Sequence, residues 1–191
     1  MPDLSIVDLW IPILVSAVFV FMASSVLHML LPFHKADYKG VPSEEGVMAK
    51  MREAGVQPGH YFFPYCADMK EMASEDFMKK REAGPVGFMT VLPSGPMKMG
   101  GQLGSWFAYT VVVGAIVAYM TSLALGAGAD YTVVFRVSGT AAFLAYAMSS
   151  FPESIWKGLP WPVSFRFMFD GIVYALLTGG TFGWLWPGIT N

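Results

Sequence analysis

Histidine and cysteine side chains are the usual metal ligands, and this chain has few of them. It contains three histidines, His28, His34 and His60, and a single cysteine, Cys66. His60 and Cys66 match no common zinc spacing, and the sequence has no CxxC or HxxxH motif. We therefore predict no metal site and no cofactor, and we interpret these histidines as polar residues at the edge of an apolar segment. The spacing leaves open whether folding turns any of the four into a ligand.

Charged side chains within apolar segments form a second group of candidate functional residues. Asp170 lies inside the last apolar segment, and Arg166 is one helical turn earlier, where an i, i+4 ion pair is available. His28 falls at a similar depth in the first segment, and Glu153 begins a connection on the same side. We predict an inner-leaflet polar cluster of His28, Glu153, Arg166 and Asp170. The simpler interpretation is a polar staple, in which these side chains only hold two helices together. A proton or substrate site is the alternative.

The elements that must position these residues are membrane helices. The chain has 191 residues, of which 54% are hydrophobic and only 14% are charged. A helix of about 20 apolar residues crosses the hydrocarbon core of a bilayer. Four segments qualify, and we predict transmembrane helices over residues 11–31, 106–125, 131–151 and 165–186. No Lys or Arg precedes Lys35, which favours a retained first span over a signal peptide. All six tryptophans fall at or just beyond the ends of these spans, as in an interfacial belt.

Small residues spaced four apart predict faces where helices approach closely. The pairs are Gly114 with Ala118, Gly171 with Ala175, and Gly179 with Gly183. Such spacing permits backbone contact between membrane helices. The contacts can form within the chain or with a partner, and the sequence does not distinguish the two.

Between the first two spans lies a long polar insert, residues 33–105. Ser43 and Gly55 bound one predicted helix, Ser74 and Gly84 bound another, and two aromatic-rich stretches predict short strands. We expect residues 1–32 to form the N-terminal segment and first span, and residues 106–191 to form the other three spans. The predicted fold is thus an all-α integral membrane protein with four transmembrane helices and a small α+β cytoplasmic insert.

Positive charge predicts the orientation of the chain. Nine of the 12 Lys and Arg residues lie in the insert, whereas the predicted outer segments contain none. The positive-inside tendency then places the insert in the cytoplasm and both termini on the periplasmic side of a bacterial inner membrane. The net charge of −2 gives no case for nucleic-acid binding. The expected partners are membrane lipids and other integral membrane subunits.

Three stretches, "SSVLHMLLPFHKADYKGVP", "GPVGFMTVLPSGP" and "TFGWLWP", resemble a family of small bacterial inner-membrane proteins without an assigned function. The resemblance implies a bacterial four-span protein and brings no active-site residues with it. Because no catalytic motif is present either, we predict no catalytic residues and no enzyme activity. A non-enzymatic subunit that docks on or stabilises a larger membrane complex is the favoured function. A small oligomeric transporter or channel is the alternative, followed by a haem- or metal-binding redox protein, for which one chain offers only His/Met haem ligation.

Overall fold

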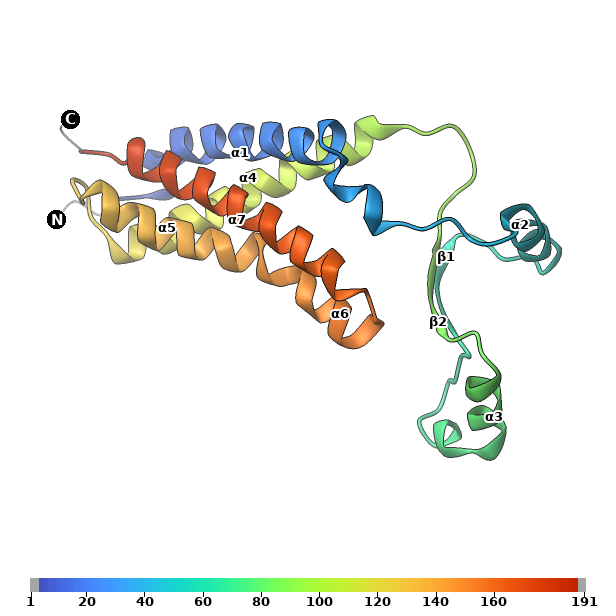
Figure 1. Ribbon diagram of the computed structural model, residues 1–191. Helices are drawn as coiled ribbons and strands as arrows, with labels where there is room; N and C mark the ends of the chain where they lie inside the picture. Colours follow the sequence, from blue (N-terminus) through green and yellow to red (C-terminus); the bar gives the residue numbers. More distant parts are fainter. Residues whose placement is uncertain (1–3, 189–191) are drawn as a thin grey trace. The chain divides into compact units, whose positions relative to one another are not determined.

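The computed structural model describes residues 4–188, which divide into two compact units. One unit contains the long helices labelled in Figure 1, and the other comprises Lys39–Met97 together with Ile155–Gly158. The predicted insert, residues 33–105, differs from this division at both ends. The segments up to Tyr38 and from Lys98 belong with the helices, and this matters because His34 lies in the first of them.

The first membrane helix is built from three consecutive helical pieces. A 3-10 turn, η1 (Ile6–Leu9), leads into α1 (Trp10–Ser25), and a π turn, η2 (Val26–Leu30), continues it. Leu31 is extended, as expected for a residue before proline, and Pro32 then begins a second 3-10 helix, η3 (Pro32–Asp37). The chain therefore changes direction after Leu30 but stays helical as far as Asp37.

Three further helical stretches complete this unit: α4 (Met99–Ala124), α5 (Tyr131–Tyr146), which runs through η5 (Met148–Ser150) into α6 (Phe151–Lys157), and α7 (Trp161–Trp184). The interruption at η5 follows from Pro152, whose ring has no N–H and clashes with the carbonyl four residues earlier. Three helices are long and apolar enough to cross a membrane, namely Ile6–Leu30, Met99–Ala124 and Tyr131–Lys157. The prediction of a membrane protein is thus supported for three of the four spans. The fourth segment is a 24-residue helix, α7, but its charged residues and glycines lower its hydropathy.

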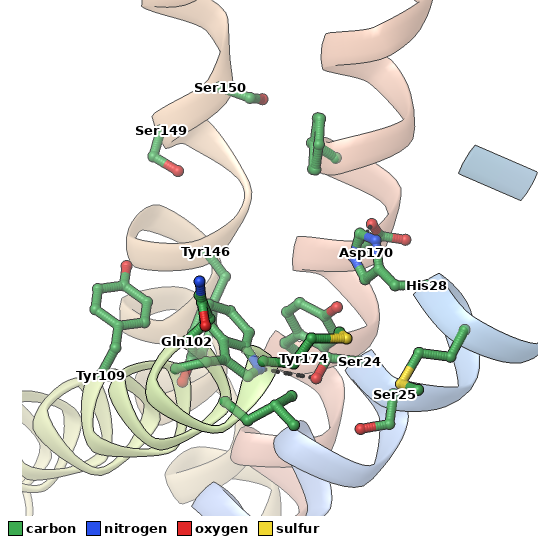
Figure 2. A pocket seen from close by; sticks show the side chains of 15 residues that line it. Ser24, Ser25, His28, Gln102, Tyr109, Tyr146, Ser149, Ser150, Asp170 and Tyr174 are labelled. Carbon is green, nitrogen blue, oxygen red and sulfur yellow. Dashed lines mark hydrogen bonds and ion pairs between the residues drawn. The ribbon is translucent and has the colours of Figure 1, made fainter. Parts of the chain in front are cut away.

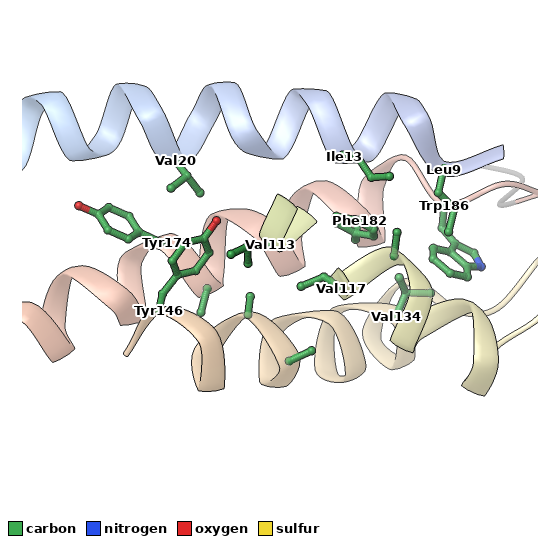
Figure 3. Packing of buried hydrophobic residues seen from close by; sticks show 14 of the residues in the cluster. Leu9, Ile13, Val20, Val113, Val117, Val134, Tyr146, Tyr174, Phe182 and Trp186 are labelled. Atoms are coloured by element: carbon green, nitrogen blue, oxygen red, sulfur yellow. The ribbon is translucent and has the colours of Figure 1, made fainter. Parts of the chain in front are cut away.

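The four long helices form a closed bundle in which each packs on two neighbours. α1 packs on α4 and α7, and α5 packs on the same two helices. Their shared core is shown in Figure 3, where Val20, Val117, Val134 and Phe182 come one from each helix and are fully buried. Trp186 is also buried, and its Nε1 donates to the Gly126 carbonyl at 3.0 Å. Its ring is therefore buried against the helices, although Trp186 lies just beyond the end of α7, as predicted.

The small residues lie at contacts within this bundle. A Cβ on Gly171 would lie 2.4 Å from the Ala147 Cα, and one on Gly179 would lie 3.0 Å from the Gly139 Cα. A Cβ on Gly183 would lie 2.7 Å from the Tyr131 ring. Ala175 and Ala118 are buried, and Gly114 faces Ile13 of α1. These faces therefore join helices of the same chain, chiefly α7 to α5.

The second unit has the helices and strands that the sequence predicts. They are α2 (Glu44–Glu53), β1 (Gly59–Phe63), η4 (Glu71–Ala73), α3 (Glu75–Ala83) and β2 (Gly87–Val91). The two strands pair in antiparallel register, with Tyr61 opposite Met89. Ser74 caps α3, since its hydroxyl accepts the Phe77 N–H at 3.3 Å. Among the described residues of Lys39–Met97, Phe77 is the one buried apolar side chain, so this unit has almost no core of its own.

Candidate functional site

A cluster of ionisable side chains lies where α1 ends, and three elements supply it. His28 comes from the π turn η2, His34 and Asp37 come from η3, and Arg166 and Asp170 come from α7. A π turn changes the direction of the side chains relative to an α-helix, and such turns recur at functional sites. The change of direction at Pro32 then places η3 against α7.

Both histidines converge on one carboxylate oxygen of Asp170. His34 Nε2 lies 2.9 Å from Asp170 Oδ2, and His28 Nε2 lies 3.3 Å from the same oxygen. The two imidazole rings are stacked, with centroids 4.1 Å apart and 18° between their planes. One ligand atom from each of the three residues lies within 4.8 Å of the others. The arrangement thus resembles three ligands around a common centre.

The opposite nitrogen of His34 is held by a second carboxylate. His34 Nδ1 lies 2.6 Å from Asp37 Oδ2, and Arg166 Nε donates to Asp37 Oδ1 at 2.5 Å. Arg166 donates to one oxygen of Asp37, and the other oxygen accepts the Nδ1–H of His34. We assign the tautomer from this hydrogen bond, which places the proton on Nδ1 and leaves the Nε2 lone pair free.

Asp170 itself is buried with its hydrogen-bonding capacity unused. The residue is 1% exposed, and neither carboxylate oxygen has a hydrogen-bond partner of normal geometry within residues 4–188. The 2.9 Å approach of His34 Nε2 meets the distance of an ion pair but not the alignment of a hydrogen bond. With neutral histidines, two carboxylates face a single guanidinium, and a charge inside a membrane protein is costly without a partner. A metal ion, a proton on a histidine or a proton on Asp170 would each remove this excess of negative charge.

The sequence prediction located part of this cluster and misplaced part of it. His28 and Asp170 come together, but Arg166 pairs with Asp37, and no ion pair joins it to Asp170 in the described chain. Glu153 lies on α6 and is not among the three residues whose ligand atoms converge. The sequence predicts His34 as an edge residue and does not single out Asp37, yet their side chains are only 10% and 2% exposed. The spacing H-x-x-D within "PFHKAD" was the available signal, since i, i+3 residues of a helical turn are neighbours.

A cavity of about 420 Å³ adjoins the cluster inside the bundle (Figure 2). His28 and Asp170 form part of its wall, whereas His34 does not reach it. Aromatic side chains form much of the remainder, and these are Trp106, Tyr109, Tyr146, Phe167 and Tyr174. The dashed line in Figure 2 is the bond from Trp106 Nε1 to Ser24 Oγ, 2.8 Å long, which joins α4 to α1 beside the cavity.

No protein-family model, curated protein or solved structure matches this chain, so the geometry alone indicates what the site can do. Two imidazoles and one carboxylate form a donor set suited to zinc and similar divalent ions. The same geometry argues against haem held by both histidines of one chain. Axial ligands approach a haem iron from opposite faces, whereas the stacked rings of His28 and His34 lie side by side.

Proposed function

We propose that this chain is an integral membrane protein that binds a divalent transition-metal ion, of the zinc class, through His28, His34 and Asp170. The convergence of two imidazole nitrogens on the buried Asp170 carboxylate, whose oxygens have no hydrogen bond within residues 4–188, carries the proposal. Zinc-bound nitrogen and oxygen atoms lie about 2.0–2.2 Å from the metal, so neighbouring ligands of a tetrahedral ion are about 3.3 Å apart. The distances of 3.3 and 2.9 Å to Asp170 Oδ2 are close to this value.

The residues around the three ligands support the same proposal. A metal-bound histidine usually donates its other ring N–H to a carboxylate, which orients the ring and raises its basicity. Asp37 occupies this position for His34, and Arg166 holds Asp37 in turn. A divalent ion would also compensate the excess of carboxylate charge. Three protein ligands would leave one coordination position for a further ligand, as in sites where zinc acts on a bound molecule.

Metal content and spectroscopy test the proposal directly. The protein, purified in mild detergent, is stripped with a chelator and reloaded with Zn²⁺ or Co²⁺. We expect about one ion per chain and, for Co²⁺, visible absorption bands of a tetrahedral site. His34→Ala and Asp170→Asn should abolish both, whereas His60→Ala is the matched control, because His60 lies on β1 in the other unit.

Two results would refute metal binding. One is substoichiometric loading of the wild-type protein, and the other is full loading of His34→Ala or Asp170→Asn. In either case the cluster would be a polar staple, in which a protonated His34 bridges Asp37 and Asp170. The distances of 2.6 and 2.9 Å from the two ring nitrogens of His34 allow this alternative.

We propose further that α7 is a fourth membrane span and that the unit containing Lys39–Met97 is cytoplasmic in a bacterial inner membrane. The packing of α7 against α1 and α5 supports the first statement, and the positive charge of the insert supports the second. Cys66, in the insert, should react with an impermeant thiol reagent only after permeabilisation. A cysteine at Ala127, between α4 and α5, should react in intact spheroplasts. The reverse labelling pattern would overturn the orientation.

A second candidate function, a subunit that docks on a larger membrane complex, rests on a different observation. The unit Lys39–Met97 buries Phe77 but leaves large apolar side chains exposed, and these include Tyr65, Met69, Leu92 and Met97. A unit with so little core gains stability from a partner surface. A photo-crosslinking residue at Leu92 or Met97 should yield one discrete protein adduct in native membranes. The lipid-facing Leu123 of α4 is the control position, and adducts of equal pattern at all three would refute docking.

A further inference from the structure

The cavity between α1, α4, α5 and α7 has the features of a binding site for a small apolar molecule. Its volume of about 420 Å³ falls within the range of about 300–1,000 Å³ that is usual for small-molecule sites. Eight of its 15 lining residues are apolar or aromatic, and its polar groups come from four serines, Gln102, His28 and Asp170. Since three of the surrounding helical stretches are long and apolar enough to span a membrane, a lipid-soluble molecule is the chemical match.

The aromatic lining favours a ligand with a flat ring. Trp106 stacks on Tyr109 with centroids 5.5 Å apart, and Tyr146 meets Tyr174 edge-on at 5.6 Å. Tyr109 also meets Tyr146 edge-on at 6.1 Å, so the four rings form one continuous surface. Aromatic rings prefer offset-stacked and edge-to-face neighbours, and this surface offers both kinds of contact to another ring.

The polar end of the cavity specifies a hydrogen-bond donor. Figure 2 shows Asp170 beside His28, with Tyr174 one turn further along α7. Both histidine contacts are made to Asp170 Oδ2, and Oδ1 is buried without a hydrogen-bond partner in the described chain. A buried carboxylate oxygen accepts a hydrogen bond strongly and cannot donate one when ionised. The complementary group on a ligand is therefore a hydroxyl, which donates, and not an ether or a carbonyl.

From these features we propose that the cavity binds a membrane-soluble phenol or hydroquinone, whose ring lies among Trp106, Tyr109, Tyr146 and Tyr174 and whose hydroxyl donates to the Asp170 carboxylate in the cavity wall. The site goes beyond metal binding, because its surface of Trp106, Tyr109, Tyr146 and Tyr174 contains none of the proposed metal ligands. It does not require a bound metal, and although both assignments use Asp170, a variant of His34 separates them because His34 does not line the cavity.

The test uses tritiated 2-decyl-1,4-benzohydroquinone, with its dimethyl ether as the comparator that has no donor. Binding is measured under argon on the full-length protein in lipid nanodiscs, with binding to empty nanodiscs subtracted. We expect one hydroquinone per chain, held at least about tenfold more tightly than the ether, since hydrogen bonds to charged groups contribute about 1.5–3 kcal/mol. Asp170→Asn should remove most of this preference.

Three variants separate cavity binding from folding and from metal binding. Ser25→Phe, which fills the cavity from α1, should abolish binding of the hydroquinone. Met22→Phe, three residues earlier and 60% exposed, should leave it intact. His34→Gln should lose metal but keep the hydroquinone, because His34 does not line the cavity. Equal binding of hydroquinone and ether, no binding above empty nanodiscs, or full binding by a correctly folded Ser25→Phe protein would each overturn the proposal.

Discussion

α7 carries two neighbouring faces with opposite chemistry. One face packs closely and holds the bundle together, and the other carries charged and polar side chains. Gly171, Ala175, Gly179 and Gly183 repeat every fourth residue toward α5, whereas Arg166, Asp170 and Tyr174 repeat every fourth residue one position earlier. The small face leaves no room, since a single added Cβ at Gly171 would overlap Ala147. The polar face has unsatisfied groups, because neither oxygen of Asp170 has a hydrogen-bond partner among residues 4–188.

The two faces of α7 have different roles. The small residues bring α7 into backbone contact with α5, so their packing role is fulfilled within the chain. The polar face is buried beside a cavity and unsatisfied, and such groups recur where a protein binds something else.

The largest effect is expected on the small face. Gly171→Ala places a methyl group 2.4 Å from the Ala147 Cα, where only backbone movement can make room. We expect a loss of about 3 kcal/mol or more in stability, at or beyond the upper end of overpacking effects, and a poor yield of monodisperse protein. Gly180→Ala is the matched control, because its Cβ would meet only the Tyr131 hydroxyl at 3.8 Å. Thermal unfolding in mild detergent compares the two, and equal stability would show that the α5–α7 contact is loose.

On the polar face, the ion pair between Arg166 and Asp37 should give the next effect. Arg166→Ala leaves the Asp37 carboxylate buried without its cation, and breaking a fully buried pair costs about 3–5 kcal/mol. Because the Arg166 side chain is 20% exposed, we expect about 2 kcal/mol. The double variant Asp37→Asn with Arg166→Gln removes both charges and should recover much of the loss in the same unfolding measurement. No recovery would mean that the arginine acts through packing and not through charge.

The small face could be predicted from sequence and the polar face only in part. A four-residue repeat of Gly and Ala along a helix is a local pattern, and helical geometry alone places it on one side. The pairing of Arg166 was misassigned because the i, i+4 rule considers one helix at a time. Its actual partner, Asp37, lies 129 residues away.

His34 was missed for a related physical reason. Pro32 marks the end of a helix, and the polar residues after it have the composition of a solvated connection. Whether they continue as coil or fold back as η3 depends on what α7 offers, namely Arg166 for Asp37 and Asp170 for His34. Such tertiary compensation of buried charge leaves no periodic signal in the sequence. By contrast, the helices and strands of the insert follow local capping and turn residues, and their prediction is confirmed.

The orienting role of Asp37 predicts a moderate loss of metal affinity. Asp37→Asn keeps the size of the side chain but removes the charge that fixes the His34 tautomer. Loss of such a carboxylate typically weakens metal binding by about 10- to 100-fold. Competition with a chromophoric chelator measures the affinity for Zn²⁺, and Asp68→Asn, in the other unit, is the control. If Asp37→Asn bound Zn²⁺ as tightly as wild type while His34→Ala did not, Asp37 would serve only its ion pair with Arg166.

The smallest effect concerns the wall of the cavity, where Ser24 and Ser25 provide a matched pair. Ser24 Oγ accepts the Trp106 Nε1–H from α4, whereas Ser25 Oγ donates only to the Phe21 carbonyl of its own helix. In a double-mutant cycle, Ser24→Ala and Trp106→Phe should show a coupling of about 0.6 kcal/mol, the average for hydrogen bonds between membrane helices. Ser25→Ala and Trp106→Phe should show none, because their side chains share no bond. Thermal unfolding of the six proteins gives both values. A coupling of zero for Ser24 would mean that Trp106 is held by ring contacts alone, and the hydroquinone site would then lack a fixed wall on α4.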